Sequence, residues 1–579
     1  MEFENLNIPR FDRKFFESEN NITWIGEGSF GGKAAGLLSA AKFIQQNINS
    51  CNFPDATINI PKFVVLRTQI FDWFLERNNL HSIAYSCESD DNILLAFLQA
   101  NLPVEILGDL YTLVENIHVP LAVRSSSMLE DAKYEPFAGI YATKMISNNQ
   151  TSTDARFQKL TEAIKFVFAS TFFKASKDYF ITSLHKVEDE KMAVIIQEVV
   201  GKKFGHKFYP NFSGVARSYN FYPTGRAKPE NGVVNLALGL GKTIVDGGLV
   251  WSYSPQFPNA VPPFADPTDV MQNTQTRFWA VNMNPIIEYD PTKETEYMVQ
   301  NYLSEADYDD TLKHIASTYD SSSQKIIMGV GSTGPRIINF SPLLSMNEFR
   351  FNDLLKHLLK VCGESLESPV EIEFAVNIDN ENSKLNFCFL QVRPMVVSDE
   401  SVDLNENELY GENIIVASNK VLGNGVIEEI SDIVFVKPEL FDKKDTQQMA
   451  TEVDLINREL VKNQKPYLLI GFGRWGSSDP WLGIPVDWGQ INGAKVIVES
   501  TLFGMNVELS QGSHFFHNLT SFNVFYFSIT YDGNFIIDWD WLKSQQTVVD
   551  SKFVRYVKLS NPLLIKVDGR KGIGVIKKC

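Results

Sequence analysis

The sequence predicts a mixed α/β protein, less regular (α+β) in places, with a large N-terminal region followed by a separate C-terminal α/β domain. Strand and helix patterns alternate over the first 200 residues, two alternating apolar runs near residue 380 indicate a β-hairpin, and the acidic stretch 399–412 is typical of a linker. The 579 residues suffice for several domains. We expect an N-terminal extension at 1–20, one region at 21–398 (subdomains at about 21–200, 201–300 and 301–398), and a last domain at 413–579.

Composition predicts a soluble cytoplasmic protein. The hydrophobic content of 44% and charged content of 21% are ordinary for a globular chain. A net charge of −17 argues against a general partner among nucleic acids or anionic membranes. The five cysteines form no CxxC pair, which fits a reducing compartment and gives no structural zinc motif. No signal peptide is visible, and no apolar run approaches the roughly 18 residues that a membrane helix needs.

The elements of the first half follow from local patterns and turn residues. Strands are expected at 21–25, 60–65, 120–124 and 192–199, and helices at 34–46, 68–77, 153–169 and 176–184. The third strand is expected to enter a serine-rich loop. A β-rich segment at 205–300 and helices at 305–318 and 346–361 precede the hairpin.

A glycine-rich loop lies between the first strand and the first helix. The stretch from Gly26 to Gly36 satisfies GxGxxG, and such glycines let backbone amides approach phosphates at a helix N-terminus. It is not a Walker A loop, because Ala34 stands where that motif has Ser or Thr. A plain tight turn is the alternative. Lys33 beside the loop favours the phosphate interpretation.

A second segment combines an arginine with three hydroxyl groups. Arg124 ends the predicted strand and precedes Ser125, Ser126 and Ser127, so a flexible loop could close there over a polyphosphate. A capped helix start is the alternative, since serine clusters are common in caps and turns. A later Gly-Lys-Thr at 241–243 is not a P-loop, because its upstream glycine is missing.

The hairpin carries polar residues on one face. Strand side chains alternate between faces, so Glu371 and Glu373 point the same way, as do Gln391 and Arg393. Closure around the polar turn at 379–384 sets Glu373 opposite Gln391 and Glu371 opposite Arg393. These groups suit a hard cation that bridges phosphate oxygens. The alternative is a solvent-facing edge hairpin with cross-strand charge pairs.

The C-terminal domain has two motifs of its own. A second GxGxxG at 471–476 lacks a following helix, because Pro480 and Pro485 exclude one, so an anion-binding loop with Arg474 is expected in preference to a dinucleotide site. Downstream, His514 and His517 could hold a metal together with a nearby glutamate (Glu499 or Glu508) or stand in for a phosphocarrier. Hydrogen-bonded core or turn histidines are the default interpretation.

Six segments in order, from about Ile25 to Met395, resemble the N-terminal nucleotide-binding region of phosphoenolpyruvate synthase and pyruvate phosphate dikinase. The resemblance implies an ATP-grasp-like fold. The segments are GGKAAGL (31–37), LAVRSSSMLEDAKYEPFAG (121–139), MAVIIQEVV (192–200), FSGVARSYNFYP (212–223), LGLGKTIVDGG (238–248) and EIEFAV…LQVRP (371–394).

The same resemblance implies roles for individual residues, with ATP and Mg²⁺ as cofactors. The basic residues are expected to bind the phosphates, one strand to contact the adenine, and the hairpin to bind the metal. The residues implied at the phosphates are Lys33, Arg124, Ser125 and Ser126, with Gln197 and Glu198 at the nucleoside. Glu373 and Gln391 are the implied Mg²⁺ ligands, Glu371 is the acidic cofactor-binding position two residues before Glu373, and Arg393 lies beside the transferred phosphate. Lys33, Arg124 and Arg393 are the implied catalytic residues.

Two departures from the family limit the expected function. Lys242 stands where an acidic residue is usual, and the family's phosphocarrier histidine motif and pyruvate-binding barrel are absent, although 412–437 faintly resembles the start of the phosphohistidine domain. We expect a Mg²⁺-dependent phosphotransferase that passes a phosphoryl group from ATP to a small molecule or a protein histidine. Alternatives are a nucleotide-sensing module and a ligase that forms an acyl-phosphate. Full phosphoenolpyruvate synthesis is not expected of this chain alone.

Overall fold

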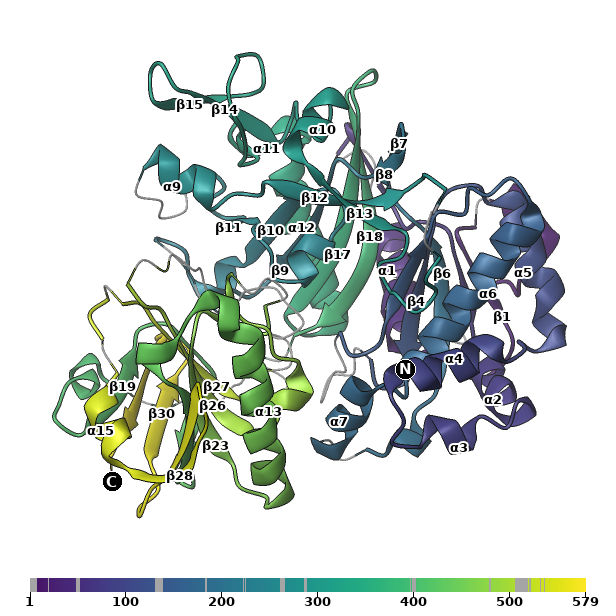
Figure 1. The fold of residues 1–579 in the computed structure, drawn as a ribbon. Coiled ribbons are helices and arrows are strands. Elements are labelled where there is room, and N and C mark those ends of the chain that lie inside the picture. The colour runs from purple at the N-terminus through teal and green to yellow at the C-terminus, as the bar shows by residue number, and fades with distance from the viewer. Residues whose placement is uncertain are drawn as a thin grey trace.

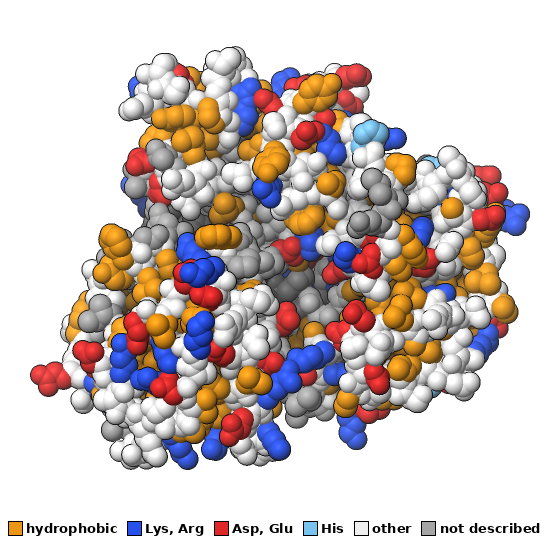
Figure 2. Space-filling view, viewed as in Figure 1, with side chains coloured by type: hydrophobic (Ala, Val, Ile, Leu, Met, Phe, Trp, Pro, Cys, Tyr) orange, Lys and Arg blue, Asp and Glu red, His pale blue; other side chains and the backbone are white. Residues whose placement is uncertain are grey.

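The N-terminal region and the C-terminal domain form two bodies that lie side by side (Figure 1), and the space-filling view shows a hollow between them (Figure 2). The computed structural model describes residues 8–18, 20–47, 53–130, 139–182, 185–221, 223, 225–260, 266–285, 289–395, 397, 402, 404–477, 481–503, 505, 519, 522–531, 533–535 and 537–578. Figure 2 shows acidic and basic side chains around the hollow.

The first sheet of the N-terminal region has five strands in the order β1-β3-β6-β4-β5. These are β1 (Ile22–Ile25), β3 (Phe63–Leu66), β6 (Met192–Glu198), β4 (Leu121–Ser127) and β5 (Thr143–Ile146). Helices α2 (Thr68–Arg77), α4 (Asp90–Gln99), α5 (Val104–Asn116) and α6 (Thr153–Ser170) bury their apolar residues in the same core as this sheet, and α3 (His81–Ala84) and α7 (Lys174–Thr182) follow α2 and α6 along the chain. Burial of such apolar faces is the main stabilising contribution.

The second sheet has six strands in the order β11-β10-β9-β17-β18-β2 and contains the hairpin. These are β11 (Trp251–Tyr253), β10 (Val233–Leu238), β9 (Phe212–Arg217), β17 (Val370–Asp379), β18 (Lys384–Pro394) and β2 (Ala56–Asn59). Helices α1 (Gly32–Asn47) and α12 (Phe351–Leu366) pack against the hairpin, and Ile372, Phe374 and Val376 are buried among them. The apolar face of the hairpin therefore meets a core, as its alternation predicts.

Two smaller sheets flank the second sheet. One has the order β13-β12-β8-β7, with β7 (Lys202–Phe204), β8 (Lys207–Tyr209), β12 (Arg277–Asn282) and β13 (Met298–Tyr302). The other has the order β15-β14-β16, with β14 (Ala316–Asp320), β15 (Lys325–Met328) and β16 (Arg336–Ile338). Four short helices lie in the same part of the chain: α8 (Lys242–Val245) between β10 and β11, α9 (Pro267–Gln272) between β11 and β12, α10 (Leu303–Tyr308) between β13 and β14, and α11 (Ser341–Ser345) between β16 and α12.

The C-terminal domain contains a seven-stranded sheet in the order β20-β27-β26-β23-β22-β29-β28. Its members are β20 (Val421–Leu422), β22 (Asp432–Val436), β23 (Tyr467–Phe472), β26 (Ala494–Ser500), β27 (Phe525–Ile529), β28 (Gln546–Asp550) and β29 (Val554–Lys558). Strands β22, β23, β26 and β27 run parallel, with helix α13 (Thr446–Lys462) between β22 and β23. A second sheet joins β19 (Ile414–Ser418), β31 (Ile573–Lys577), β30 (Leu564–Asp568) and β21 (Asn424–Ile427); β24 (Arg474–Trp475), β25 (Gly483–Ile484) and helix α15 (Trp539–Ser544) complete the domain.

Contacts between described residues of the C-terminal domain and the N-terminal region include one at α7 and a second at Gly247. Phe522 lies between Tyr179 of α7 and Trp488, with ring centroids 4.9 and 5.2 Å away. At the second place, Arg474 Nη1 donates to the Gly247 carbonyl at 2.6 Å. The C-terminal domain therefore contacts α7, which follows the first sheet's helix α6, and the loop between β10 and β11 of the second sheet (Figure 1).

Most predicted elements are present, and two predictions are wrong. Residues 125–127 belong to strand β4 and do not form a loop, because β6 pairs with β4 as far as Ser127. The helix expected at 305–318 ends at Tyr308, since Asp310 has a φ of 56°, in the left-handed region that a helix cannot continue. Ala316 then begins β14.

The segments outside the two large bodies also pack. Phe11 and Phe15, within the predicted extension, are buried in the core of the first sheet. In the predicted linker, Leu404 and Leu409 are buried next to β19 and β31. The proposed domain limits themselves stay predictions.

Among the described residues, no single helix is long and apolar enough to cross a membrane. One bent pair, α4 with α5, passes this test jointly by length and composition, with an angle of 91° between the helices.

The glycine-rich loop requires glycine for packing. Gly31 has a φ of +73°, and a Cβ there would lie 1.8 Å from the Ser126 carbonyl oxygen. A side chain would therefore force the loop away from β4.

We predict that Gly31→Ala lowers the free energy of unfolding by at least about 2 kcal/mol, because it combines a left-handed backbone with a backbone clash. Gly108→Ala is the control, since Gly108 lies in α5 and a Cβ there meets nothing within 4 Å. It should be neutral or stabilising by up to about 1 kcal/mol. Thermal unfolding of both variants measures this, and equal melting temperatures would contradict the packing role.

Candidate nucleotide site

The two large sheets meet at the guanidinium of Arg124. Its Nη1 donates to the Leu390 carbonyl at 2.7 Å and to Gln197 Oε1 at 3.2 Å, and its Nη2 donates to Gln391 Oε1 at 2.9 Å. Gln197 belongs to β6 of the first sheet, whereas Leu390 and Gln391 belong to β18 of the second. The arginine therefore fixes the hairpin relative to the first sheet.

The hairpin has the predicted register. Glu373 lies opposite Gln391, and Glu371 lies opposite Arg393. The four polar side chains therefore share one face, and this face points toward Arg124. The register prediction is confirmed.

A β-bulge next to this pair was not foreseen. Glu373 pairs with Gln391, and the next residue of β17, Phe374, pairs with Phe389. Leu390 is therefore the extra residue on β18. The extra residue of a bulge leaves the regular ladder. Its carbonyl instead accepts the shortest hydrogen bond of Arg124.

Glu373 is close to two arginines and partly open to solvent. Its carboxylate oxygens lie 3.9 Å from Arg124 Nη2 and 3.9 Å from Arg393 Nη2, and 18% of its side chain is exposed. Within the described ranges, no group of three or more His, Cys, Asp or Glu could hold a metal. Glu373 and Gln391 alone fit Mg²⁺, which takes one or two protein ligands together with phosphates and water.

Glu371 is buried between two arginines. Its Oε1 accepts from Arg393 Nε at 2.8 Å, and its Oε2 accepts from Arg217 Nε at 2.5 Å. The Glu371 side chain is 1% exposed, so these bonds act where water does not screen them. Sequence reasoning missed Arg217, although strand 212–217 contained it; only the pairing of β9 with β17 reveals its partner.

Lys33 is engaged within the protein. Its Nζ lies 2.8 Å from Glu130 Oε1 and donates to Ser125 Oγ at 3.1 Å. Glu130 also accepts from Ser125 Oγ at 2.9 Å and from the Ser127 amide at 2.9 Å. A phosphate that binds Lys33 must therefore compete with a buried carboxylate, which sequence reasoning did not identify.

Ser126 binds the glycine-rich loop to β4. Its hydroxyl donates to the Phe30 carbonyl at 2.9 Å and accepts from the Ala34 amide at 3.0 Å. The Ser29 amide of the same loop donates to Thr68 Oγ1 at 2.9 Å. Several loop amides thus have protein acceptors, which supports the tight-turn interpretation of the glycines alongside the phosphate one.

Gln197 and Glu198 lie at the end of β6. Gln197 is 2% exposed, and its Nε2 has no hydrogen-bond acceptor among the described residues, while its Oε1 binds Arg124. Burial raises the pKa of the Glu198 carboxyl, partly opposed by Lys62. An unpaired buried donor beside Arg124 fits a ligand rich in acceptors, and ATP is such a ligand.

Other sequence candidates lie elsewhere. Lys242 pairs with Asp246 at 3.0 Å and lies over the Trp279 ring, 5.9 Å from its centroid. His514 and His517 lie outside the described residues, as does Glu508. Glu499 is buried on β26 and accepts from the Tyr526 hydroxyl.

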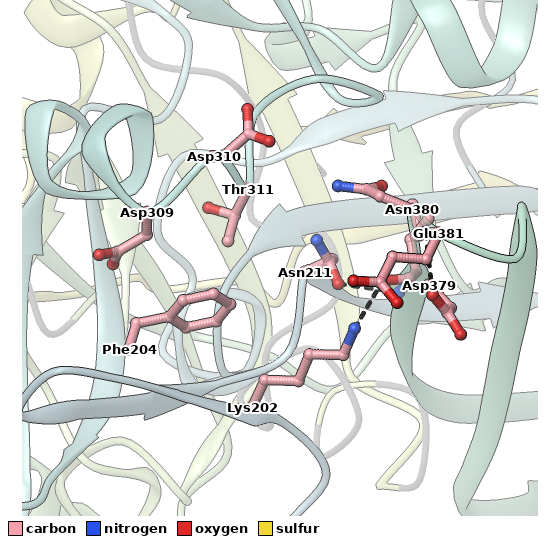
Figure 3. A pocket seen from close by; sticks show the side chains of 10 residues that line it. Lys202, Phe204, Asn211, Asp309, Asp310, Thr311, Asp379, Asn380 and Glu381 are labelled. Carbon is pink, nitrogen blue, oxygen red and sulfur yellow. Dashed lines mark hydrogen bonds between the residues drawn. The ribbon is translucent and has the colours of Figure 1, made fainter.

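A cavity of about 390 Å³ lies at the turn end of the hairpin (Figure 3). Figure 3 shows Lys202 directed toward this turn, and its Nζ donates to the Ile378 carbonyl at 3.0 Å. Asp309 of the cavity already accepts from Tyr209 at 2.6 Å and pairs with Lys207 at 2.8 Å. The cavity is thus at the opposite end of β17 and β18 from the Arg124 cluster, by which we mean Arg124, Gln197, Glu373, Gln391 and Arg393.

Comparison with known families agrees with this geometry. Residues 27–413 match the model of the pyruvate phosphate dikinase AMP/ATP-binding domain. The chain belongs to this family. The match covers about two thirds of the chain, including the second sheet and the first sheet apart from β1, and the seven-stranded C-terminal sheet lies outside it. No curated protein matches the chain.

Membership of the pyruvate phosphate dikinase family accounts for the ATP-grasp-like α/β fold of the N-terminal region. The domain is one that binds AMP or ATP, and the family contains phosphotransferases of the kinase and dikinase type.

Glu190 joins the two chain segments on either side of residues 131–138. Its Oε1 accepts from the Met128 amide at 3.1 Å, and its Oε2 accepts from the Tyr141 hydroxyl at 2.9 Å. Burial raises the pKa of the Glu190 carboxyl from 4.5 to about 7, despite these donors.

The raised pKa predicts a pH dependence of stability. The folded carboxyl retains its proton up to about pH 7, whereas the unfolded one loses it near 4.5. The free energy of unfolding should therefore fall by roughly 3 kcal/mol as the pH rises across this interval. Glu190→Gln, which stays neutral, should remove this fall, and exposed Glu188→Gln should not. Melting temperatures between pH 4.5 and 7.5 test this; an unchanged slope in Glu190→Gln would contradict it.

Proposed function

We propose that this protein is a Mg²⁺-dependent phosphotransferase that uses ATP, and that the Arg124 cluster is its active site. One observation carries the proposal: Arg124 contacts Gln197 and Gln391, while Glu373 lies 3.9 Å from both Arg124 and Arg393. Phosphoryl transfer depends mainly on positioning and charge neutralisation, which these side chains supply.

Within this proposal, Glu373 and Gln391 hold the metal ion. Gln391 Oε1 accepts from Arg124 Nη2 at 2.9 Å, and a side-chain carbonyl oxygen is the kind of ligand that a hard cation takes. Mg²⁺ held by these residues would supply neutralisation of the phosphate charge. Arg124 and Arg393 on either side would orient the triphosphate by charge-assisted hydrogen bonds.

The remaining predicted residues take supporting roles. Glu371 holds Arg393 in place through the 2.8 Å bond to its Nε, so it is a positioning residue. Gln197 and Glu198 border the nucleoside. Lys33 binds phosphate only when the phosphate replaces Glu130 as its partner. Glu130 therefore competes with the ligand for Lys33.

The acceptor is proposed to be a small molecule or a protein histidine. The C-terminal domain contacts the segment LGLGKTIVDGG (238–248) through the hydrogen bond from Arg474 to the Gly247 carbonyl. This contact supports an acceptor that enters between the two bodies.

A nucleotide-sensing module without turnover is the second candidate. The buried pair of Lys33 with Glu130 favours it, because a lysine retained by a carboxylate does not neutralise a transferred phosphate.

Incubation of the full chain with γ- and β-labelled ATP and Mg²⁺, with and without pyruvate, tests the proposal. AMP with phosphate indicates dikinase-type chemistry, and ADP alone indicates a kinase or ATPase. Tight ATP binding without any turnover would contradict the proposal of an enzyme and support the nucleotide-sensing module.

We predict that Glu373→Ala and Arg393→Ala each lower turnover at least about a hundredfold, because each removes charge stabilisation of the transferred group. Matched controls lie at the turn end of the same strands: Glu381→Ala and Lys384→Ala replace exposed residues there and should retain wild-type rates. Product formation under saturating ATP measures this. Wild-type rates in the first two variants would refute the assigned roles.

A further inference from the structure

The cavity at the turn end of the hairpin has a mixed and charged lining. Its volume of about 390 Å³ lies within the range of small-molecule sites in proteins. Four carboxylates and one lysine line it, together with Phe204, Asn211 and Thr311. Figure 3 shows Asp310 and Thr311 on one side of the cavity and Glu381 of the hairpin turn on the other. A ligand in the cavity would therefore be contacted from two directions.

Two of the four carboxylates are used within the fold. Asp309 accepts from the Tyr209 hydroxyl at 2.6 Å and pairs with Lys207 at 2.8 Å. Asp379 accepts from the Asn382 side chain at 2.7 Å within the hairpin turn, and this hydrogen bond lowers the pKa of the Asp379 carboxyl. Both negative charges therefore have partners of their own.

The other two carboxylates, Asp310 and Glu381, are exposed and available to a ligand. In the described part of the chain, neither side chain has a hydrogen bond or an ion pair. They do not converge on one ion, because among the described residues no group of three or more His, Cys, Asp or Glu could hold a metal. Two separated carboxylates instead suit two positive groups of one organic molecule.

Two donors of the cavity have hydrogen-bonding capacity left, and both are anchored on Ile378. Asn211 is only 6% exposed, and its Oδ1 accepts from the Ile378 amide at 2.8 Å. This bond leaves the Nδ2 group for the cavity, and Nδ2 has no acceptor among the described residues. Lys202 Nζ donates to the Ile378 carbonyl at 3.0 Å, and an ammonium group has further donors. A buried amide donor without an acceptor, next to a lysine, indicates an anionic oxygen group of a ligand.

One aromatic ring supplies an apolar wall. Phe204 belongs to β7, and its ring centroid lies 4.9 Å from that of Tyr209. Tyr209 is fully buried, so packing fixes the position of the Phe204 ring. A methylene chain placed against this ring would be removed from water, which is favourable.

We propose that this cavity binds an amino acid with a basic side chain, such as lysine. The ligand carboxylate accepts from Lys202 and Asn211, and its two ammonium groups bind Asp310 and Glu381. Its methylene chain packs against Phe204. The one negative and two positive charges of such a ligand complement the lysine and the two unpaired carboxylates of the cavity. The proposal does not rest on phosphotransferase activity, because the cavity lies at the opposite end of the hairpin from the Arg124 cluster.

Calorimetric titration of the full chain with three related ligands tests the class of ligand. L-lysine has both ammonium groups and the carboxylate, norleucine lacks the side-chain ammonium group, and cadaverine lacks the carboxylate. We expect lysine to bind, and norleucine and cadaverine to bind at least about tenfold more weakly, because each loses one charged contact.

Variants of the chain test the assigned contacts. We expect Asp310→Asn and Lys202→Gln each to weaken lysine binding at least about tenfold. Asparagine tolerates the left-handed backbone of Asp310, whose φ is 56°, so this variant changes the charge alone. Lys202→Gln should leave the weaker binding of cadaverine unchanged, since cadaverine has no carboxylate. Matched controls are exposed residues outside the cavity, Lys203→Gln on β7 and Glu364→Gln on α12, which should bind lysine as the wild type does.

Absence of lysine binding to the wild type, or equal lysine binding by the wild type and both cavity variants, would overturn the proposal. Cadaverine that binds as tightly as lysine would also overturn it and assign the cavity to a diamine. Binding of Mg²⁺ alone that disappears in Asp310→Asn, with no binding of lysine, would assign the cavity to a metal ion. Because ATP is absent from these titrations, none of these results bears on the proposed phosphotransferase.

Discussion

The position of the Arg124 guanidinium between the two sheets is the interaction on which the rest of the site depends. One side chain contacts β6 of the first sheet and β18 of the second, and a bulged residue supplies its carbonyl acceptor. Arg124 thereby links Gln197 to the hairpin. With it, Glu373 lies between two arginines and stays partly exposed. This is the position that we propose for Mg·ATP.

Buried charges around this contact are mostly shared among several partners. Glu371 accepts from Arg393 and Arg217, and Glu130 pairs with Lys33. Removal of one partner from a buried pair leaves an uncompensated charge, which costs more than the pair contributes. This coupling explains why the basic residues have fixed positions before any ligand binds. It also means that an entering phosphate rearranges existing pairs and does not meet free lysines.

Local pattern was sufficient for much of the fold and for part of the site. Alternation of side chains gave the register of Glu373 with Gln391, because strand geometry leaves little freedom. The pairing of Arg217 with Glu371 joins residues 154 positions apart, and no local pattern encodes such a contact. The helix expected at 305–318 was wrong because apolar periodicity does not register the left-handed Asp310. Glu130 was missed since its role arises only when β4 meets the glycine-rich loop.

We propose that the Arg124 cluster binds Mg·ATP. A crystal structure of the full chain with Mg²⁺ and β,γ-imido-ATP tests it most directly. The account predicts an ion about 2.1 Å from oxygens of Glu373 and Gln391, with the triphosphate against Arg124 and Arg393. A nucleotide bound elsewhere, for example in the cavity beside Lys202, or bound without an ion at Glu373, would contradict it.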